Sequence, residues 1–125
     1  ATFRAGVTAF AAQKPVHGEC GGYMVLGRSL TDADGVSHAM AGLLSVETSF
    51  AKRKMNLGYR QATLLADSPL GRSGQIIRGH EFHYARIIEP GRDDPLSMIA
   101  DGLGNPIGPS GGRREHVSGS FFHAV

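Results

Sequence analysis

The sequence predicts an α/β domain whose second half is rich in antiparallel strands. Three observations support this prediction: a helical apolar spacing near the start, a strand-length stretch that ends at a glycine-flanked cysteine, and short β-type runs separated by turns after residue 40. The chain has 125 residues, the usual size of one domain, so we expect a single domain over residues 1–125. Its 18 glycines follow no period of three and are best explained by turns.

The first elements carry the clearest pattern. Residues 2–13 place apolar side chains at steps of three and four, which predicts a helix that a Lys-Pro pair ends. Residues 16–20 have the length of a strand, residues 21–22 form a sharp glycine turn, and residues 23–26 open a second helix. Together these elements predict one crossover unit of a parallel sheet, with Cys20 at its bend.

The remaining elements are shorter. After residue 40, turn-rich pieces separate apolar runs of strand length, so we expect several strands, mostly antiparallel and partly at a sheet edge. The residues at 90–95 read as a turn and those at 105–114 as a loop, because both are rich in Gly and Pro. The predicted strands are residues 43–48, 59–65, 75–77, 82–88, 98–103 and 117–121.

Composition excludes several classes of protein. A lone Cys20 rules out an intrachain disulfide and a multi-cysteine zinc site, and it makes a reducing, cytoplasmic setting the default. No apolar run reaches the roughly 18–20 residues of a membrane span, so no membrane is expected. The formal net charge is only +2 and the basic residues form small separated groups, so nucleic-acid binding is not indicated.

The strongest chemical signal is the stretch GECGG at residues 18–22. It has the form of a nucleophile elbow, in which the reactive side chain sits on a strained turn between a strand and a helix. Glycines on both sides let the chain fold sharply and let a substrate carbonyl approach, so Gly21 and Gly22 are candidate substrate-binding residues. The Gly21 amide is placed to donate to an oxyanion, and the helix dipole favours a Cys20 thiolate. The alternative is an inert, buried cysteine.

A cysteine nucleophile needs a base, and the chain has six histidines. His123 is favoured because it follows the last predicted strand, and a parallel sheet would bring the carboxyl end of that strand beside the elbow. The alternative is that His123 is an ordinary surface or core histidine. His80 and His83 do not form an H-E-x-x-H motif, and on a strand they face opposite sides. A zinc pair is therefore not expected, and we predict no metal site.

Three separated strings, in the same order along nearly the whole chain, carry a family resemblance. PVHGECGGYMVL (15–26), RGHEFHY (78–84) and VSGSFFHAV (117–125) resemble the glutamine amidotransferase domain of the cobyrinic acid a,c-diamide synthases, and the hydrogenobyrinic acid form most of all. The resemblance implies a flavodoxin-like class I glutamine amidotransferase domain. The separation of 103 residues between Cys20 and His123 also suits this family.

The resemblance implies a reaction and assigns roles in it. Cys20 would attack the side-chain amide of glutamine to form a thioester, and His123 would act as base and acid. The ammonia would pass to a synthetase half that uses ATP and Mg²⁺ to amidate the a and c carboxylates of a corrin precursor in cobalamin biosynthesis. Whether the parent enzyme is a homodimer is left open.

Two departures from the family pattern stand out. Most class I glutaminases place a glutamate two residues after the catalytic histidine, where this chain has Val125. Glu81, within the GHEFHY string, is the candidate to replace that glutamate. The alternative is that Glu81 is only a strand residue paired with a nearby arginine. The chain also opens later than a complete module and lacks a G-x-x-x-x-G-K-[ST] loop. We therefore expect a C-terminal fragment with half an oxyanion hole, weakly active or inactive alone and without its ATP-binding domain.

Two other functions remain open on the sequence. One is a cysteine-elbow hydrolase of the dienelactone-hydrolase kind, which would act on small esters without responding to glutamine. The other is a non-catalytic module that only docks on a synthetase half. The acceptor tetrapyrrole is not specified by any residue pattern.

Overall fold

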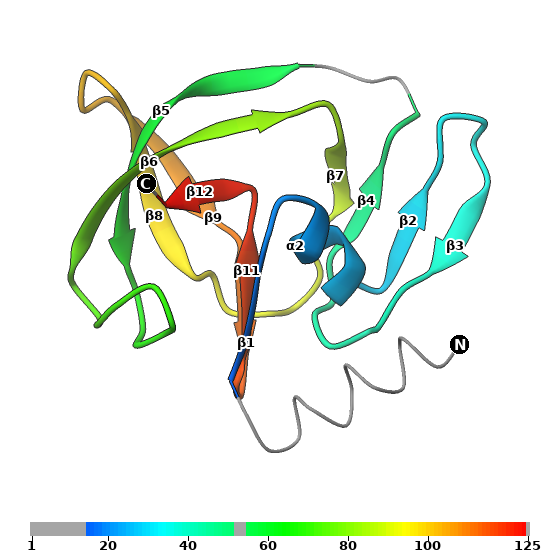
Figure 1. The fold of residues 1–125 in the computed structure, drawn as a ribbon, viewed down its shortest axis with the longest axis horizontal. Coiled ribbons are helices and arrows are strands. Elements are labelled where there is room, and N and C mark those ends of the chain that lie inside the picture. The colour runs from blue at the N-terminus through cyan, green and yellow to red at the C-terminus, as the bar shows by residue number, and fades with distance from the viewer. Residues whose placement is uncertain (1–14, 52–54, 125) are drawn as a thin grey trace.

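The computed structural model describes residues 15–51 and 55–124, and the helix predicted at residues 2–13 lies outside them. The described chain contains one helix and three small sheets (Figure 1). The antiparallel, β-rich character predicted for the second half is confirmed: the sheet that holds most of it is antiparallel at every pairing.

The three-stranded sheet contains the predicted elbow. Its order is β1 (Val16–Glu19), β11 (Val117–Ser120) and β10 (Gly112–Arg114). β1 and β11 are parallel and in register, and they lie side by side at the centre of Figure 1. Because parallel strands end at the same edge of a sheet, the residues that follow β1 and β11 meet there. This is the arrangement predicted for Cys20 and the last strand.

The other two sheets flank this centre. The five-stranded sheet has the order β12 (Phe122–Ala124), β6 (Ile76–His83), β5 (Asn56–Leu64), β8 (Ser97–Asp101) and β9 (Pro106–Ser110). The four-stranded sheet has the order β3 (Ser37–Ala39), β2 (Ser29–Thr31), β4 (Glu47–Ser49) and β7 (Arg86–Glu89). Within it, β2 and β4 are parallel.

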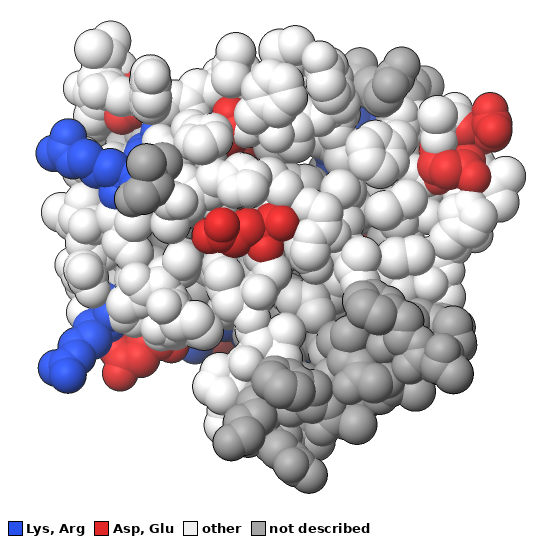
Figure 2. Space-filling view, viewed as in Figure 1, with Lys and Arg blue, Asp and Glu red and all other residues white. Residues whose placement is uncertain are grey.

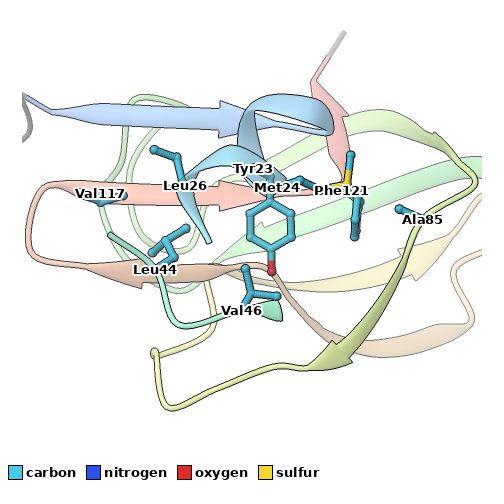
Figure 3. Packing of buried hydrophobic residues seen from close by; sticks show 8 residues of the cluster. All are labelled: Tyr23, Met24, Leu26, Leu44, Val46, Ala85, Val117 and Phe121. Atoms are coloured by element: carbon cyan, nitrogen blue, oxygen red, sulfur yellow. The ribbon is translucent and has the colours of Figure 1, made fainter. Parts of the chain in front are cut away.

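Two clusters of buried apolar side chains hold the sheets together. In the larger cluster, Tyr23 of α2 (Gly21–Leu26) packs edge-on against Phe121, with ring centroids 5.2 Å apart, and Leu44 and Val46 lie around it (Figure 3). The smaller cluster is centred on Phe122 in the five-stranded sheet. Consecutive residues at the end of the chain thus belong to different clusters, which fixes the direction in which β12 leaves β11.

The prediction of a loop at residues 105–114 is wrong. This segment forms the strands β9 and β10. Each is an edge strand of its sheet, where a proline without an N–H donor is tolerated, so Pro106 and Pro109 do not prevent pairing. Glycine and proline content therefore misled the prediction at this point.

The crossover unit is also corrected. The sharp turn lies at Cys20 itself, since Gly21 and Gly22 already belong to α2. α2 leads into β2 of another sheet, while β1 pairs with β11, about a hundred residues later. The predicted crossover unit joined elements that follow one another in sequence, whereas the chain leaves this sheet after α2.

Smaller differences concern strand limits. The run 43–48 contributes only the start of β4, and the run 82–88 is split between β6 and β7 by a bend at Tyr84. The short strands β2 and β3 were not predicted, because three-residue strands with polar side chains carry little periodic signal.

The face of the molecule in Figure 2 gives little indication of a charged partner. On the face seen in Figure 2, acidic and basic side chains form small separated groups on a largely uncharged surface. Among residues 15–51 and 55–124, no helix has the length and apolar character needed to cross a bilayer.

Candidate active site

The elbow at Cys20 has the predicted strand–turn–helix order. β1 ends at Glu19, α2 begins at Gly21, and Cys20 between them has φ 51° and ψ −109°. A non-glycine residue with positive φ is uncommon and costs free energy, and such residues are concentrated at functional sites. The turn is anchored by a 3.0 Å hydrogen bond from the Cys20 amide to the Ser120 carbonyl of β11.

The glycines around Cys20 have different physical roles. A Cβ on Gly18 would come within 2.6 Å of the Gly22 backbone and 2.8 Å of Leu26, so this position is restricted to glycine by packing. Gly21 and Gly22 are exposed, and a Cβ on either would meet no described atom within 4 Å. The space beside Gly21 and Gly22 is therefore open to a ligand.

The thiol of Cys20 is partly buried and donates to the carbonyl oxygen of Phe121 at 3.4 Å. Burial, followed by the negative charges of Glu19 and Glu81, raises the pKa of this thiol above its ordinary value. This direction is opposite to the one expected from the helix dipole; α2 has only six residues, and two carboxylates lie near the sulfur. At neutral pH the thiol is mostly protonated, so a nucleophilic role requires a base.

His123 lies on β12, directly after the edge where β1 and β11 end. Its register partner on β6 is His80, and the two imidazole rings stack with centroids 5.3 Å apart. The His123 side chain is 39% exposed, so a ligand can reach it. The topology thus brings His123 to the elbow edge of the molecule, as the sequence predicted.

Glu19 is the residue that the sequence prediction missed. One carboxylate oxygen, Oε1, lies 3.5 Å from Nδ1 of His123. The other, Oε2, lies 3.4 Å from Nε2 of His17 and 3.5 Å from the amide of Ala124, both neighbours of the same edge. The available signal was the parallel pairing of β1 with the last strand, which sets Glu19 opposite Ser120 and three residues from His123.

Glu81 lies on the other face of the five-stranded sheet. In register, Glu81 pairs with Phe122 and His80 pairs with His123, and because successive residues of a strand point to opposite faces, Glu81 and His123 are on opposite sides. The Glu81 carboxylate binds Arg60 Nε at 2.9 Å and His83 Nε2 at 3.0 Å. The structure therefore brings Glu81 into an ion pair with an arginine and does not bring it to His123.

The bonds of Glu81 form a partly buried network. The hydrogen bond from His83, and then the hydrogen bond and positive charge of Arg60, lower the pKa of Glu81 below its usual value. Both ring nitrogens of His83 face acceptors, Glu81 on one side and the Ala85 carbonyl at 2.8 Å on the other, an arrangement that a doubly protonated imidazolium satisfies. The ring also stacks on Phe121, with centroids 3.8 Å apart.

A cavity of about 510 Å³ lies beside the Glu81–His83 network. Glu81 and His83 line it together with Tyr23 and Phe121. In the part of the chain that the structure describes, no group of three or more His, Cys, Asp or Glu side chains is arranged to hold a metal ion.

Comparison with known proteins adds to this geometry. The model of the CobB/CobQ-like glutamine amidotransferase domain matches residues 2–125. The chain belongs to this family. Members of the family are named for glutamine amidotransfer, so the Cys20 elbow and His123 lie in a domain of that kind.

Several curated relatives are similar over nearly all of the chain. Identity is 72% over 123 residues to the hydrogenobyrinate a,c-diamide synthase of Agrobacterium fabrum, 67% over 124 residues to that of Mesorhizobium japonicum, and 54% over 123 residues to that of Rhodobacter capsulatus. These matches cover 98–99% of this chain but only 28% of each relative. The chain thus corresponds to just over a quarter of the length of these synthases.

Proposed function

We propose that this chain is the glutaminase portion of an ATP-dependent corrin a,c-diamide synthase of cobalamin biosynthesis. One observation carries the proposal: the single cysteine sits on a strained strand–helix turn beside the end of β11, after which the chain continues directly to His123 on β12, in a chain of the glutamine amidotransferase family. The names of the relatives, hydrogenobyrinate a,c-diamide synthase, support the choice of a corrin precursor as acceptor.

The reaction begins with proton transfer from the Cys20 thiol to the imidazole of His123. The thiolate sulfur attacks the side-chain carbonyl carbon of glutamine, and the negative charge develops on the carbonyl oxygen. When the C–N bond breaks, the His123 imidazolium gives its proton to the departing nitrogen, and ammonia leaves a thioester on Cys20. Water, deprotonated by His123, then attacks the thioester, the C–S bond breaks, and glutamate is released. The net change is glutamine plus water to glutamate plus ammonia.

Stabilisation of the oxyanion is assigned in part to Gly21. The first amides of a helix have no acceptor within the helix, so the N–H of Gly21 is placed to donate to the oxygen. Open space at Gly21 and Gly22 supports close approach of the substrate carbonyl. We assign the second donor to another part of the synthase; loss of one such donor typically reduces the rate about 10²–10³-fold.

The amidation step belongs, in this proposal, to the rest of the synthase. ATP and Mg²⁺ would activate the a and c carboxylates there, and ammonia from the glutaminase site would displace the activated oxygen. We further propose that in the whole enzyme the parallel β1–β11 pair is part of a flavodoxin-like sheet, and that the enzyme is cytoplasmic, in keeping with a lone, unpaired Cys20.

The first prediction concerns covalent labelling of the whole synthase. A glutamine analogue with an electrophilic carbon in place of the amide should alkylate Cys20, because only this thiol lies beside the proposed glutamine subsite. Peptide mass spectrometry locates the adduct, and excess glutamine should protect the residue. Iodoacetamide, which has no glutamine backbone, is the control reagent, and at the same concentration it should label Cys20 far more slowly.

Other outcomes would contradict the proposal. An adduct on a different residue would exclude Cys20 as the nucleophile. Turnover of small esters without any response to glutamine would favour a hydrolase of the dienelactone-hydrolase kind. Glutamine-dependent amidation that persists in a Cys20→Ala synthase would favour a non-catalytic docking role.

A further inference from the structure

The proton-transfer role of His123 requires that its imidazole be held in one orientation and one tautomer. A neutral imidazole carries one proton, so one ring nitrogen must donate while the other accepts the thiol proton. An acceptor on Nδ1 would keep the proton there and leave Nε2 free to act as the base. A carboxylate is the strongest such acceptor among protein side chains.

Among the described residues, the carboxylate in contact with His123 is that of Glu19. Its Oε1 lies 3.5 Å from Nδ1 of His123, and its Oε2 is held by His17 Nε2 at 3.4 Å and the Ala124 amide at 3.5 Å. His17 is in turn fixed by a 2.8 Å hydrogen bond between its Nδ1 and the hydroxyl of Ser118. Hydrogen bonds of catalytic groups are often long in the absence of substrate and shorten when it binds.

The backbone also fixes where Glu19 lies. It is the last residue of β1, opposite Ser120 of β11, and it immediately precedes Cys20. The same parallel pairing therefore positions the nucleophile and the carboxylate, and β12 carries His123 back to them. Glu81 has both of its oxygens bound to other side chains, on the opposite face of the sheet.

We propose that Glu19 is the positioning residue of this site, with its carboxylate accepting the Nδ1 proton of His123 so that Nε2 exchanges protons with Cys20 and with the leaving ammonia. The proposal rests on the glutaminase function proposed above. Glu19 touches no reacting atom and acts only through His123. Its carboxylate also stabilises the imidazolium that forms when the thiol is deprotonated.

The test uses the whole synthase with Glu19→Gln, Glu19→Asp and, as a control, Glu89→Gln on an exposed strand away from the site. Because Gln keeps the shape but removes the charge, we expect kcat for glutamine hydrolysis to fall about 10²–10⁴-fold with KM changed less than threefold. Glu19→Asp should recover part of kcat. Amidation with free ammonia should stay within twofold in all three variants, which shows that they fold.

A spectroscopic readout makes the contact testable independently of activity. In ¹⁵N-histidine NMR of the synthase, His123 should show mainly the Nδ1–H tautomer, and Glu19→Gln should shift its population toward Nε2–H. A Glu19→Gln enzyme with kcat within threefold of the unsubstituted one, equal loss of glutamine-dependent and ammonia-dependent rates, or an unchanged His123 tautomer would each overturn the role of Glu19. Absence of glutaminase activity in the unsubstituted synthase would instead contradict the proposed function. In that case the NMR measurement of the His123 tautomer would still show whether Glu19 accepts its Nδ1 proton.

Discussion

At the scale of single residues, the main feature is a thiol whose surroundings disfavour the thiolate. Burial and the carboxylates of Glu19 and Glu81 all act in the same direction on the pKa of Cys20. Free cysteines with such surroundings are unreactive unless a base removes the proton during the reaction. The carboxylate of Glu19, which makes the thiolate less stable, also contacts His123, so one charged group lies beside both the thiol and the base proposed for it.

This arrangement predicts the pH dependence of alkylation. A raised pKa means that less thiolate is present at a given pH, so the rate with iodoacetamide should rise with pH and reach half its maximum above the ordinary value of about 8.5. Removing the Glu19 charge with Glu19→Gln should move this midpoint to lower pH. The measurement is the modification rate of the Cys20 peptide by mass spectrometry, with urea-denatured protein as the control.

A midpoint at or below that of the denatured protein would show that the folded structure favours the thiolate. In that case the helix N-terminus, and not the carboxylates, would dominate at Cys20.

At the scale of elements, close packing between β1, β11 and α2 sets the geometry of the elbow. Gly18 and Gly119 face each other in the parallel register. A Cβ on Gly119 would come within 2.7 Å of the Tyr23 ring and 2.9 Å of the Gly18 carbonyl, and one on Gly18 would meet the Gly22 backbone. The two glycines therefore let a helix and two strands approach closely at the nucleophile.

This packing predicts that alanine substitutions at Gly18 and at Gly22 have different effects on stability. Gly18→Ala should destabilise the fold by about 1–3 kcal/mol, since backbone atoms of Gly22 cannot move away as a flexible side chain could. Gly22→Ala, which meets open space inside a helix, should leave stability unchanged or slightly raised. Urea unfolding curves of the two variants give the comparison, and equal midpoints for both would contradict this account of the turn.

The elements also show what the sequence was able to predict. The strand before Cys20, the helix after it and the central β-strands follow from local apolar patterns and glycine positions, and they were predicted with small errors in their limits. The parallel approach of the last strand to the elbow was also predicted, whereas the strands β9 and β10 depend on long-range contacts and on edge positions, which no local pattern contains. Glu19 was missed for the same reason: its contact with His123 joins residues 104 positions apart.

At the scale of the whole molecule, the end of the chain joins the two apolar clusters. Phe121 packs with Tyr23 in the larger cluster, while Phe122 is only 1% exposed in the smaller one. Buried aromatic side chains of this kind contribute strongly to stability and hold neighbouring backbone in place. Both apolar clusters therefore hold the backbone that leads to His123, so the position of His123 relative to Cys20 depends on the packing of both clusters.

In the proposed function, Cys20 releases ammonia from glutamine for use elsewhere in a larger synthase. The most direct measurement compares amidation of the corrin precursor with glutamine and with free ammonia as nitrogen donors, in the whole synthase and in its Cys20→Ala variant. The glutamine-dependent rate should fall at least about 10³-fold, while the ammonia-dependent rate stays within twofold. Retention of the glutamine-dependent rate, or equal loss of both rates, would contradict this role of Cys20.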